Sequence, residues 1–382
     1  MRKEQQELQA RKNKVIDYLK ENNYDSYIIT NPYNIFYLLN FYFVATERPI
    51  VCMIDKEGSV SLVVPELEAE EAKKVEIVDN VITYFEYPGP GDLNEYIIKN
   101  FKRVRNNLKR IVMDTSGYQL YKVYQDNFEK VEVDNYILRL REIKSENEIE
   151  YLKTAAKYAD YIVSYGAKNV KEGITEIELL NKMTSATLSK MIEEVDALIY
   201  VPGGPAGGLI PSGTRTSLPH ALPSNRSIKR GDNLILSCGA NYRGYRVECE
   251  RTFFIDEVPT RKVKAFNVMK EAQELAISLM KPGVKCSTID KKVLGYIEEN
   301  GLGEFIKHRT GHGKGLEEHE PPWVESGDNT VLKKGMILSS EPGIYIEGYA
   351  GFRHSDTVLI TEDEPLVLTK YPKKLEEMVI KL

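Results

Sequence analysis

Cysteine, tryptophan and histidine are scarce in this sequence, which has four, one and five of them among its 382 residues. The four cysteines are scattered, without the spacing of zinc ligands, which excludes a cysteine-based metal site: Cys52, Cys238, Cys249 and Cys286. We therefore expect reduced thiols in a cytoplasmic protein. A run of about 18 apolar residues is also missing, so no segment is expected to span a membrane.

The charge balance and the length narrow the class further. The chain has 52 basic and 57 acidic residues, a net charge of −5, so it has no basic excess and no nucleic-acid partner is expected. The first residues, MRKEQQELQARKNK, are polar and lack the apolar core of a signal peptide. Because 382 residues exceed one ordinary hydrophobic core, we expect two domains.

The first third of the chain alternates strand and helix patterns, which predicts an α/β layer domain over residues 1–138. It contains no Gly-rich loop between a strand and a helix, so nucleotide binding is not expected there. Ser145 and Glu148 then have the spacing of a capping box, which indicates the start of a long helix. We therefore predict a second domain over residues 139–382.

The second domain shows an internal repeat. Helical patterns cover residues 158–191 and 263–299, and strand patterns follow at 198–245 and 335–361. Each second helix of a pair begins with an N-cap residue and an acidic residue three positions later: Thr175 with Glu178, and Ser287 with Asp290. The repeat predicts an α+β domain with pseudo-twofold symmetry and a site where its two sets of strands meet.

Residues Leu234–Phe254 predict a β-hairpin around the turn Asn241–Gly244. Because side chains alternate along a strand, one face of its second strand presents Arg246, Glu248, Glu250 and Thr252. The two glutamates lie roughly 6.5–7 Å apart along the strand and repel unless a cation, a proton or a metal lies between them. A solvated outer face is the alternative interpretation.

All five histidines lie in the second domain: His220, His308, His312, His319 and His354. Four of them, and Glu341, lie in loops and strands rich in glycine and proline. Together with Glu248 and Glu250 they form a set suited to general acid–base catalysis or metal binding. We predict functional roles for His220, His312 and His319 and a surface position for His308.

Five segments follow the signatures of a known family in the same order: SYIITNPYNIFYLLNFY, IKSENEIEYLKTAAKYAD, PHALPSNRSIKRGD, TGHGKGLEEHEPP and SSEPGIYIEGYAGFRHSDTVLIT. The chain resembles the Xaa-Pro dipeptidases, aminopeptidases P and creatinases over nearly its whole length. The resemblance implies a creatinase/prolidase-type N-terminal domain, a pita-bread catalytic domain and a homodimer.

The resemblance also implies five metal ligands, of which two are serines in this chain, one Asp is a longer Glu, and two are unchanged. Family metallopeptidases hold two ions through Asp, Asp, His, Glu and Glu, and the corresponding residues here are Ser237, Glu248, His312, Glu341 and Ser355. Two ions about 3.5–4 Å apart need bridging carboxylates, so a dinuclear centre is not expected. Glu248, His312 and Glu341 would suffice for one divalent ion of Mn, Co or Zn.

Creatinase is the branch of this family that works without a metal. Its catalytic histidine corresponds to His220, and the first glutamate that grips its guanidinium substrate corresponds to Glu250. The second such glutamate falls at His354, and the arginine that would hold the carboxylate of creatine falls at Trp323. Creatine itself is therefore not expected to be the substrate.

Three cationic side chains stand beside the motif positions: Arg246, Lys314 and His354. A pocket that has lost two metals but keeps three carboxylates needs positive charge, since uncompensated carboxylates take up protons. We predict that these cations fill the space and charge of the metals. The alternative is that Arg246 and Lys314 point away from the site.

We predict a hydrolase that cleaves a C–N bond, amide or amidine, in a small molecule or a dipeptide. His220 would act as the base, Glu250 would orient the substrate nitrogen, and His312 with His319 would hold the oxyanion. The residues expected to bind substrate are Glu248, Glu341, Arg246, Lys314, His354 and Trp323. No cofactor is expected beyond one divalent ion at most. Two alternatives stay open: a single-ion Xaa-Pro dipeptidase, as the EHEPPW segment suggests, and a non-catalytic binding protein.

Overall fold

The computed structural model describes residues 3–87, 89–115, 117–195 and 204–382. The chain divides into two compact units, residues 1–141 and 142–382, where the sequence predicts a boundary after residue 138. The strand residues predicted at 198–203 lie outside the described part. Among the helices that the structure describes, none has both the length and the apolar character needed to cross a bilayer.

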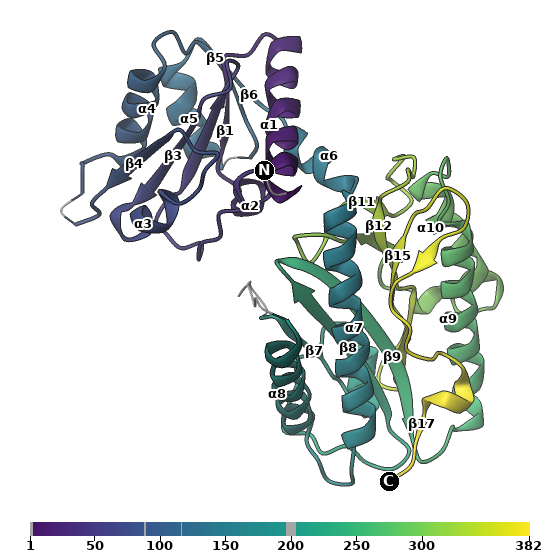
Figure 1. Cartoon of the computed structure of the whole chain (residues 1–382). Helices are drawn as coiled ribbons and strands as arrows, with labels where there is room; N and C mark the ends of the chain where they lie inside the picture. The colour runs from purple at the N-terminus through teal and green to yellow at the C-terminus, as the bar shows by residue number, and fades with distance from the viewer. Residues whose placement is uncertain (1–2, 88, 116, 196–203) are drawn as a thin grey trace. The chain divides into compact units, whose positions relative to one another are not determined.

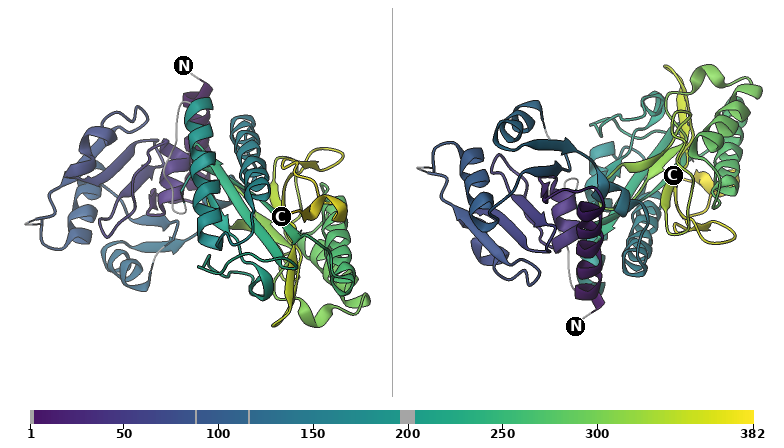
Figure 2. Two further views of the ribbon diagram at one scale, coloured as in Figure 1. Left: turned by 90° about the horizontal axis from the view of Figure 1, so that it is seen from below. Right: turned by 90° about the horizontal axis from the view of Figure 1, so that it is seen from above.

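The N-terminal unit is an α/β layer, as predicted, with a six-stranded mixed sheet in the order β4-β3-β2-β1-β5-β6. Helices α4 and α5 contribute to the apolar core on one face of this sheet, and α1 packs on the other (Figure 2). Ile28 and Met113 point into the core that α4 and α5 cover. The elements are α1 (Lys3–Glu21), β1 (Ser26–Ile29), α2 (Pro32–Leu39), β2 (Val51–Asp55), β3 (Val60–Pro65), α3 (Ala69–Ala72), β4 (Asn80–Tyr84), α4 (Leu93–Val104), β5 (Arg110–Met113), α5 (Tyr118–Asn127), β6 (Lys130–Val133) and α6 (Tyr136–Glu142).

The second unit contains two principal sheets, each with its own pair of helices, and confirms the predicted α+β repeat (Figure 1). The first sheet has the order β17-β9-β8-β7 and packs against α7 (Glu146–Asn169) and α8 (Glu176–Glu194). The second has the order β11-β10-β12-β15-β16 and lies beside α9 (Thr260–Leu279) and α10 (Cys286–Glu299). The strands are β7 (Ala206–Leu209), β8 (Asn233–Tyr242), β9 (Tyr245–Ile255), β10 (Gly311–Gly313), β11 (Glu320–Val324), β12 (Ile337–Ser340), β13 (Gly343–Ile346), β14 (Ala350–Arg353), β15 (Asp356–Leu359), β16 (Leu366–Val367) and β17 (Val379–Ile380).

The helix starts differ between the two repeats. Capping boxes form at α7 and α8 as predicted, through Ser145 with Glu148 and Thr175 with Glu178. The prediction for α10 is wrong, because no side chain caps this helix. Ser287 donates to Asn329 Oδ1 at 3.1 Å instead, and Asp290 accepts from the backbone and hydroxyl of Thr310 at 3.0 and 2.8 Å. Asp290 therefore fixes the segment that leads into β10.

The predicted hairpin is β8–β9, closed by Arg243 and Gly244, whose φ angles of +51° and +84° suit a two-residue turn of the type that follows strand twist. β9 also meets the second sheet. Glu250 N donates to Ser355 O at 3.0 Å, and Ser355 N donates to Glu250 O at 3.1 Å. This bridge joins the two halves of the unit at the residues where the sequence places the site.

Candidate active site

A cavity of about 1090 Å³ opens in the second unit between the β8–β9 hairpin and the segments around β10, β12 and β14. It gathers most of the residues that the sequence singled out. The predicted residues on its wall are His220, Ser237, Arg246, Glu248, Glu250, His312, His319 and Glu341. Residues more than a hundred positions apart in the chain therefore meet in one place, as the repeat predicts.

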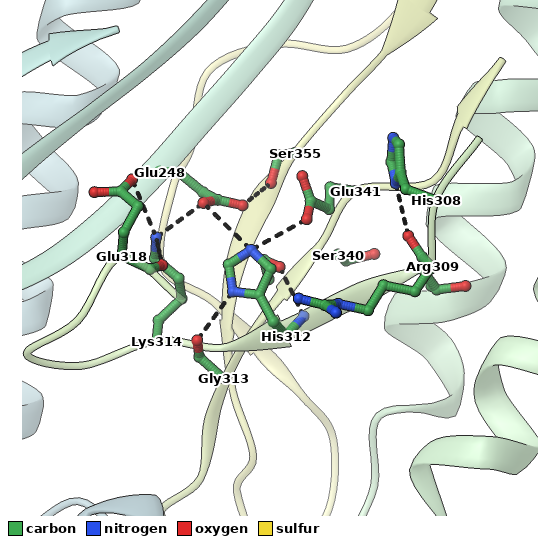
Figure 3. A network of polar contacts seen from close by, with 12 residues as sticks. Glu248, His308, Arg309, His312, Gly313, Lys314, Glu318, Ser340, Glu341 and Ser355 are labelled. Atoms are coloured by element: carbon green, nitrogen blue, oxygen red, sulfur yellow. Dashed lines mark hydrogen bonds and ion pairs between the residues drawn. The ribbon is translucent and has the colours of Figure 1, made fainter. Parts of the chain in front are cut away.

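Glu248 contacts a lysine and a serine, where the family resemblance implies contacts with metal ions (Figure 3). Lys314 Nζ lies 2.9 Å from Glu248 Oε2, and Ser355 Oγ donates to Oε1 at 2.7 Å. The ammonium is fully buried, and its other hydrogen bond goes to the carbonyl of Glu318 at 2.8 Å. Burial alone would lower the pKa of Lys314, but Glu248 and Glu318 together outweigh burial and raise the pKa. The geometry agrees with the prediction that this cation lies against the carboxylates of the site, here Glu248.

His312 links Glu248 to Glu341 (Figure 3). Its Nδ1 donates to the carbonyl of Gly313 at 3.0 Å, so Nε2 faces Glu341 Oε1 at 3.1 Å and Glu248 Oε2 at 3.9 Å. Burial alone would lower the pKa of His312, but the two carboxylates raise it. Burial would likewise raise the pKa of Glu341, but His312 holds it below its usual range. These opposite shifts favour the charged form of each group, an imidazolium beside a carboxylate.

Glu250 is held by Arg353, a residue that the sequence analysis missed. Arg353 Nε donates to Glu250 Oε2, and its Nη2 reaches Oε1 at 3.2 Å and Ser237 Oγ at 3.0 Å. Ser237 Oγ also hydrogen-bonds Oε1, and Arg353 Nη1 donates to Tyr345 OH at 2.8 Å. Burial raises the pKa of Glu250, and Arg353 opposes that rise. Because both carboxylate oxygens are engaged, the guanidinium-gripping role predicted for Glu250 does not fit.

His354 does not supply a cation to the cavity, so that prediction is wrong. The side chain is completely buried, its ring meets the ring of Phe266 edge-on at 5.2 Å, and Nδ1 accepts from Thr252 N at 3.3 Å. Burial keeps the pKa of His354 well below its usual value, so the ring is neutral. Arg353 lines the cavity in its place, since neighbouring side chains along a strand point to opposite faces.

Arg246 lines the cavity and Trp323 does not, and each contacts a further charged side chain. Arg246 Nε pairs with Glu318 Oε2 at 2.8 Å, so it compensates Glu318. Trp323 is not among the described residues that line the cavity, so the cavity wall gives no support to its predicted contact with substrate. Its ring lies 4.3 Å from the guanidinium carbon of Arg309, which does line the cavity.

The histidines around the cavity differ in exposure. His220 is exposed on the wall, and His319 is exposed with its ring centroid 4.1 Å from that of His312. Burial, His312 and Lys314 lower the pKa of His319. His308, predicted to be a surface residue, instead lines the cavity, where its Nε2 lies 2.8 Å from Tyr345 OH and burial lowers its pKa. No pattern in the local sequence distinguishes His308 from a surface residue.

The residues do not fit a pair of metal ions. The hydroxyl of Ser237 already bonds Glu250, and that of Ser355 already bonds Glu248. The Lys314 ammonium bonds the other oxygen of Glu248. One ion is a different matter. Glu248, His312 and Glu341 each offer a ligand atom, all within 4.8 Å of one another, and they are the one such group in the described part of the chain. A histidine with two carboxylates is a suitable donor set for one divalent ion.

Comparison with known proteins agrees with this architecture. Residues 150–362 match the model of metallopeptidase family M24, and residues 11–143 match the creatinase/prolidase N-terminal domain. An uncharacterized peptidase of Staphylococcus aureus (strain USA300) is 31% identical over 367 residues, which cover 94% of this chain and 99% of that protein.

Two solved structures resemble the whole chain. The Xaa-Pro dipeptidase from Bacillus anthracis is 27% identical with a TM-score of 0.84, and the alignment covers 98% of this chain and 100% of that one. The prolidase from Pyrococcus horikoshii OT3 is 30% identical with a TM-score of 0.83, with 96% and 99% covered. The predicted pita-bread catalytic domain and the creatinase/prolidase-type N-terminal domain are thereby confirmed.

Proposed function

Because the chain belongs to metallopeptidase family M24, we propose that it is a hydrolase that cleaves the C–N bond of a dipeptide or another small amide without a dinuclear metal centre. The observation that carries this proposal is the Lys314 ammonium, buried 2.9 Å from Glu248 in the carboxylate cluster. An amide is favoured over an amidine because Arg353 already occupies Glu250. The dipeptidase names of the solved relatives support the same substrate class.

In this proposal His220 is the general base. It is exposed on the cavity wall, so a water molecule and the leaving nitrogen both have access to its ring. It would take a proton from the attacking water and return it to the leaving nitrogen, a role worth about 10²–10⁴ in rate.

The cations of the cluster would stabilise the charge that develops on the substrate oxygen. His312 would act as an imidazolium beside Glu341, which raises its pKa, and the exposed ring of His319 lies against it. Fixed donors in a site with little water stabilise an oxyanion more than solvent does. Glu248 would then act by holding Lys314 in place, not by gripping the substrate.

The test is turnover of Xaa-Pro dipeptides and small amides by protein stripped of metal. We expect the wild-type chain to hydrolyse at least one of them, and His220→Ala to lower kcat by about 10²–10⁴. Leu222→Ala is the matched control, because Leu222 is 72% exposed in the same loop. Retained activity in His220→Ala would contradict its role, and no turnover across the panel would favour a non-catalytic binding protein.

A peptidase with one divalent ion is the second candidate, favoured by the Glu248–His312–Glu341 group. These three residues would hold an ion of Mn, Co or Zn, which when bound polarises a carbonyl as a Lewis acid. Metal analysis of the purified chain separates the two candidates. About one ion per chain, with activity lost to a chelator and restored by the ion, would favour this second candidate. We also propose a homodimer, which light scattering would report as twice 43.6 kDa.

A further inference from the structure

Two buried lysine–glutamate pairs in the second unit have almost the same geometry but different neighbours. Lys314 Nζ lies 2.9 Å from Glu248 Oε2, and Lys144 Nζ lies 2.9 Å from Glu320 Oε1. Both ammonium groups are fully buried. Among the described residues, Glu248 belongs to a group of three ligand-type side chains, whereas Glu320 belongs to no such group.

That group is already arranged as a metal site would be. Ser355 Oγ fixes one oxygen of Glu248, and the Gly313 carbonyl accepts from His312 Nδ1, which leaves Nε2 turned toward both carboxylates. Metal-binding histidines are oriented by the same kind of hydrogen bond on the other ring nitrogen. Three ligands with their own supports are therefore present, and the cation beside them is the side chain of Lys314.

We propose that the Lys314 ammonium is the resident cation of this site and excludes divalent metal ions from it. The ammonium and a metal ion compete for the same oxygen, Glu248 Oε2, and a unit positive charge beside the group repels a second cation. A chain with a neutral residue at position 314 binds one divalent ion through Glu248, His312 and Glu341. This inference concerns metal affinity and does not depend on which substrate the chain cleaves.

The test is Co²⁺ and Mn²⁺ binding by Lys314→Met, measured by calorimetry and by the visible spectrum of bound Co²⁺. A charge within about 4–6 Å shifts the proton affinity of a group by about one to three pKa units. We therefore expect the variant to bind one ion about 10- to 1000-fold more tightly than the wild-type chain. Its Tm should rise on adding the ion, whereas that of the wild-type chain should not.

Lys144→Met is the matched control, because it removes an equally buried ammonium from Glu320 and should leave metal affinity unchanged. Adding Glu248→Gln to Lys314→Met should abolish the gain. If Lys314→Met does not fold, Lys314→Gln keeps a neutral donor at the same position and should show the same gain.

Two results would overturn the proposal: a folded neutral variant at position 314 that binds no tighter than the wild-type chain, or a wild-type chain that binds one ion equally tightly. The first result leaves the proposed hydrolysis untouched, and a failure of turnover leaves the metal measurement untouched.

Discussion

Glu248 and Glu250 stand two residues apart on β9, and each accepts a hydrogen bond from a serine, yet the chain compensates them differently. Glu250 meets an arginine, whose planar fork occupies both carboxylate oxygens. Glu248 meets a lysine, a compact charge that contacts one oxygen and a backbone carbonyl. An arginine fork and a lysine point charge are not interchangeable at such sites.

The different partners of Glu248 and Glu250 give these two residues different roles on the same strand. At Glu250 the arginine also bonds Ser237 and Tyr345, so this end is a closed network of hydrogen bonds. At Glu248 the neighbouring His312 and Glu341 still face the carboxylate. We infer that the Glu250 end holds the two sheets together and that the Glu248 end supplies the charged groups that would stabilise the oxyanion.

Removing the arginine should have the largest effect on stability. Arg353→Met leaves Glu250 buried without its fork, and breaking a buried ion pair costs about 3–5 kcal/mol. We expect a loss near the upper end of that range, measured by denaturant unfolding. Arg353→Lys keeps the charge but not the fork, so it should lose less. Equal stability of Arg353→Met and the wild-type chain would remove the structural role.

Removing the lysine should cost less, about 3 kcal/mol in the free energy of unfolding. Glu248 keeps its bond from Ser355, and His312 stays within 3.9 Å as a second cation. Lys314→Met should therefore be more stable than Arg353→Met while losing more activity. The double variant with Glu248→Gln should recover part of the stability, because it removes the uncompensated charge. A larger loss in Lys314→Met than in Arg353→Met would reverse the assignment of the two ends.

A third ion pair crosses the same seam with reversed polarity, from Arg251 on β9 to Asp356 on β15 at 2.7 Å. Burial would raise the pKa of Asp356, but Arg251 and Lys373 lower it to about 2. A carboxyl whose pKa is lowered in the folded state stabilises that state at pH values above its ordinary pKa. The contribution fades as the pH falls toward 2.

The expected contribution is about 2 kcal/mol. Urea unfolding at about pH 5 and about pH 2.5 should show a smaller difference for Asp356→Asn than for the wild-type chain. An identical pH dependence of the two proteins would mean that this pair contributes nothing.

The smallest effect should come from Arg246, the cation two residues before Glu248 on β9. Its partner Glu318 is 58% exposed, and exposed ion pairs contribute about 0.2–1 kcal/mol. Arg246→Met should therefore lower the free energy of unfolding by no more than about 1 kcal/mol, as followed by urea unfolding. A loss as large as that of Lys314→Met would place Arg246 in the cluster after all.

Local patterns in the sequence predict the parts of the site that lie on one element. The hairpin, the shared face of Glu248 and Glu250 and the first two capping boxes follow from strand alternation and N-cap chemistry, and the structure confirms them. The third cap is not formed because Asp290 finds a distant partner, Thr310. Propensity within a helix cannot anticipate such a contact.

Alternation along the extended chain separates Arg353 from its neighbour His354. The resemblance places Ser355 at a ligand position, its Oγ bonds Glu248, and a side chain two residues away on an extended chain shares that face. Alternation alone therefore favours Arg353 over His354. The partner of Arg353 was out of reach, because Glu250 lies 103 positions away on another strand. Tyr345 and His308 were missed for the same reason: their roles arise from contacts between segments.

The bridge between Glu250 and Ser355 is made entirely by main-chain atoms. Such hydrogen bonds are indifferent to which side chains the two residues carry. The distance between the sheets can thus stay constant while evolution, or a protein engineer, exchanges ligands for hydroxyls and ammonium groups around it. Side chains around the site can therefore change singly while the two sheets keep their positions.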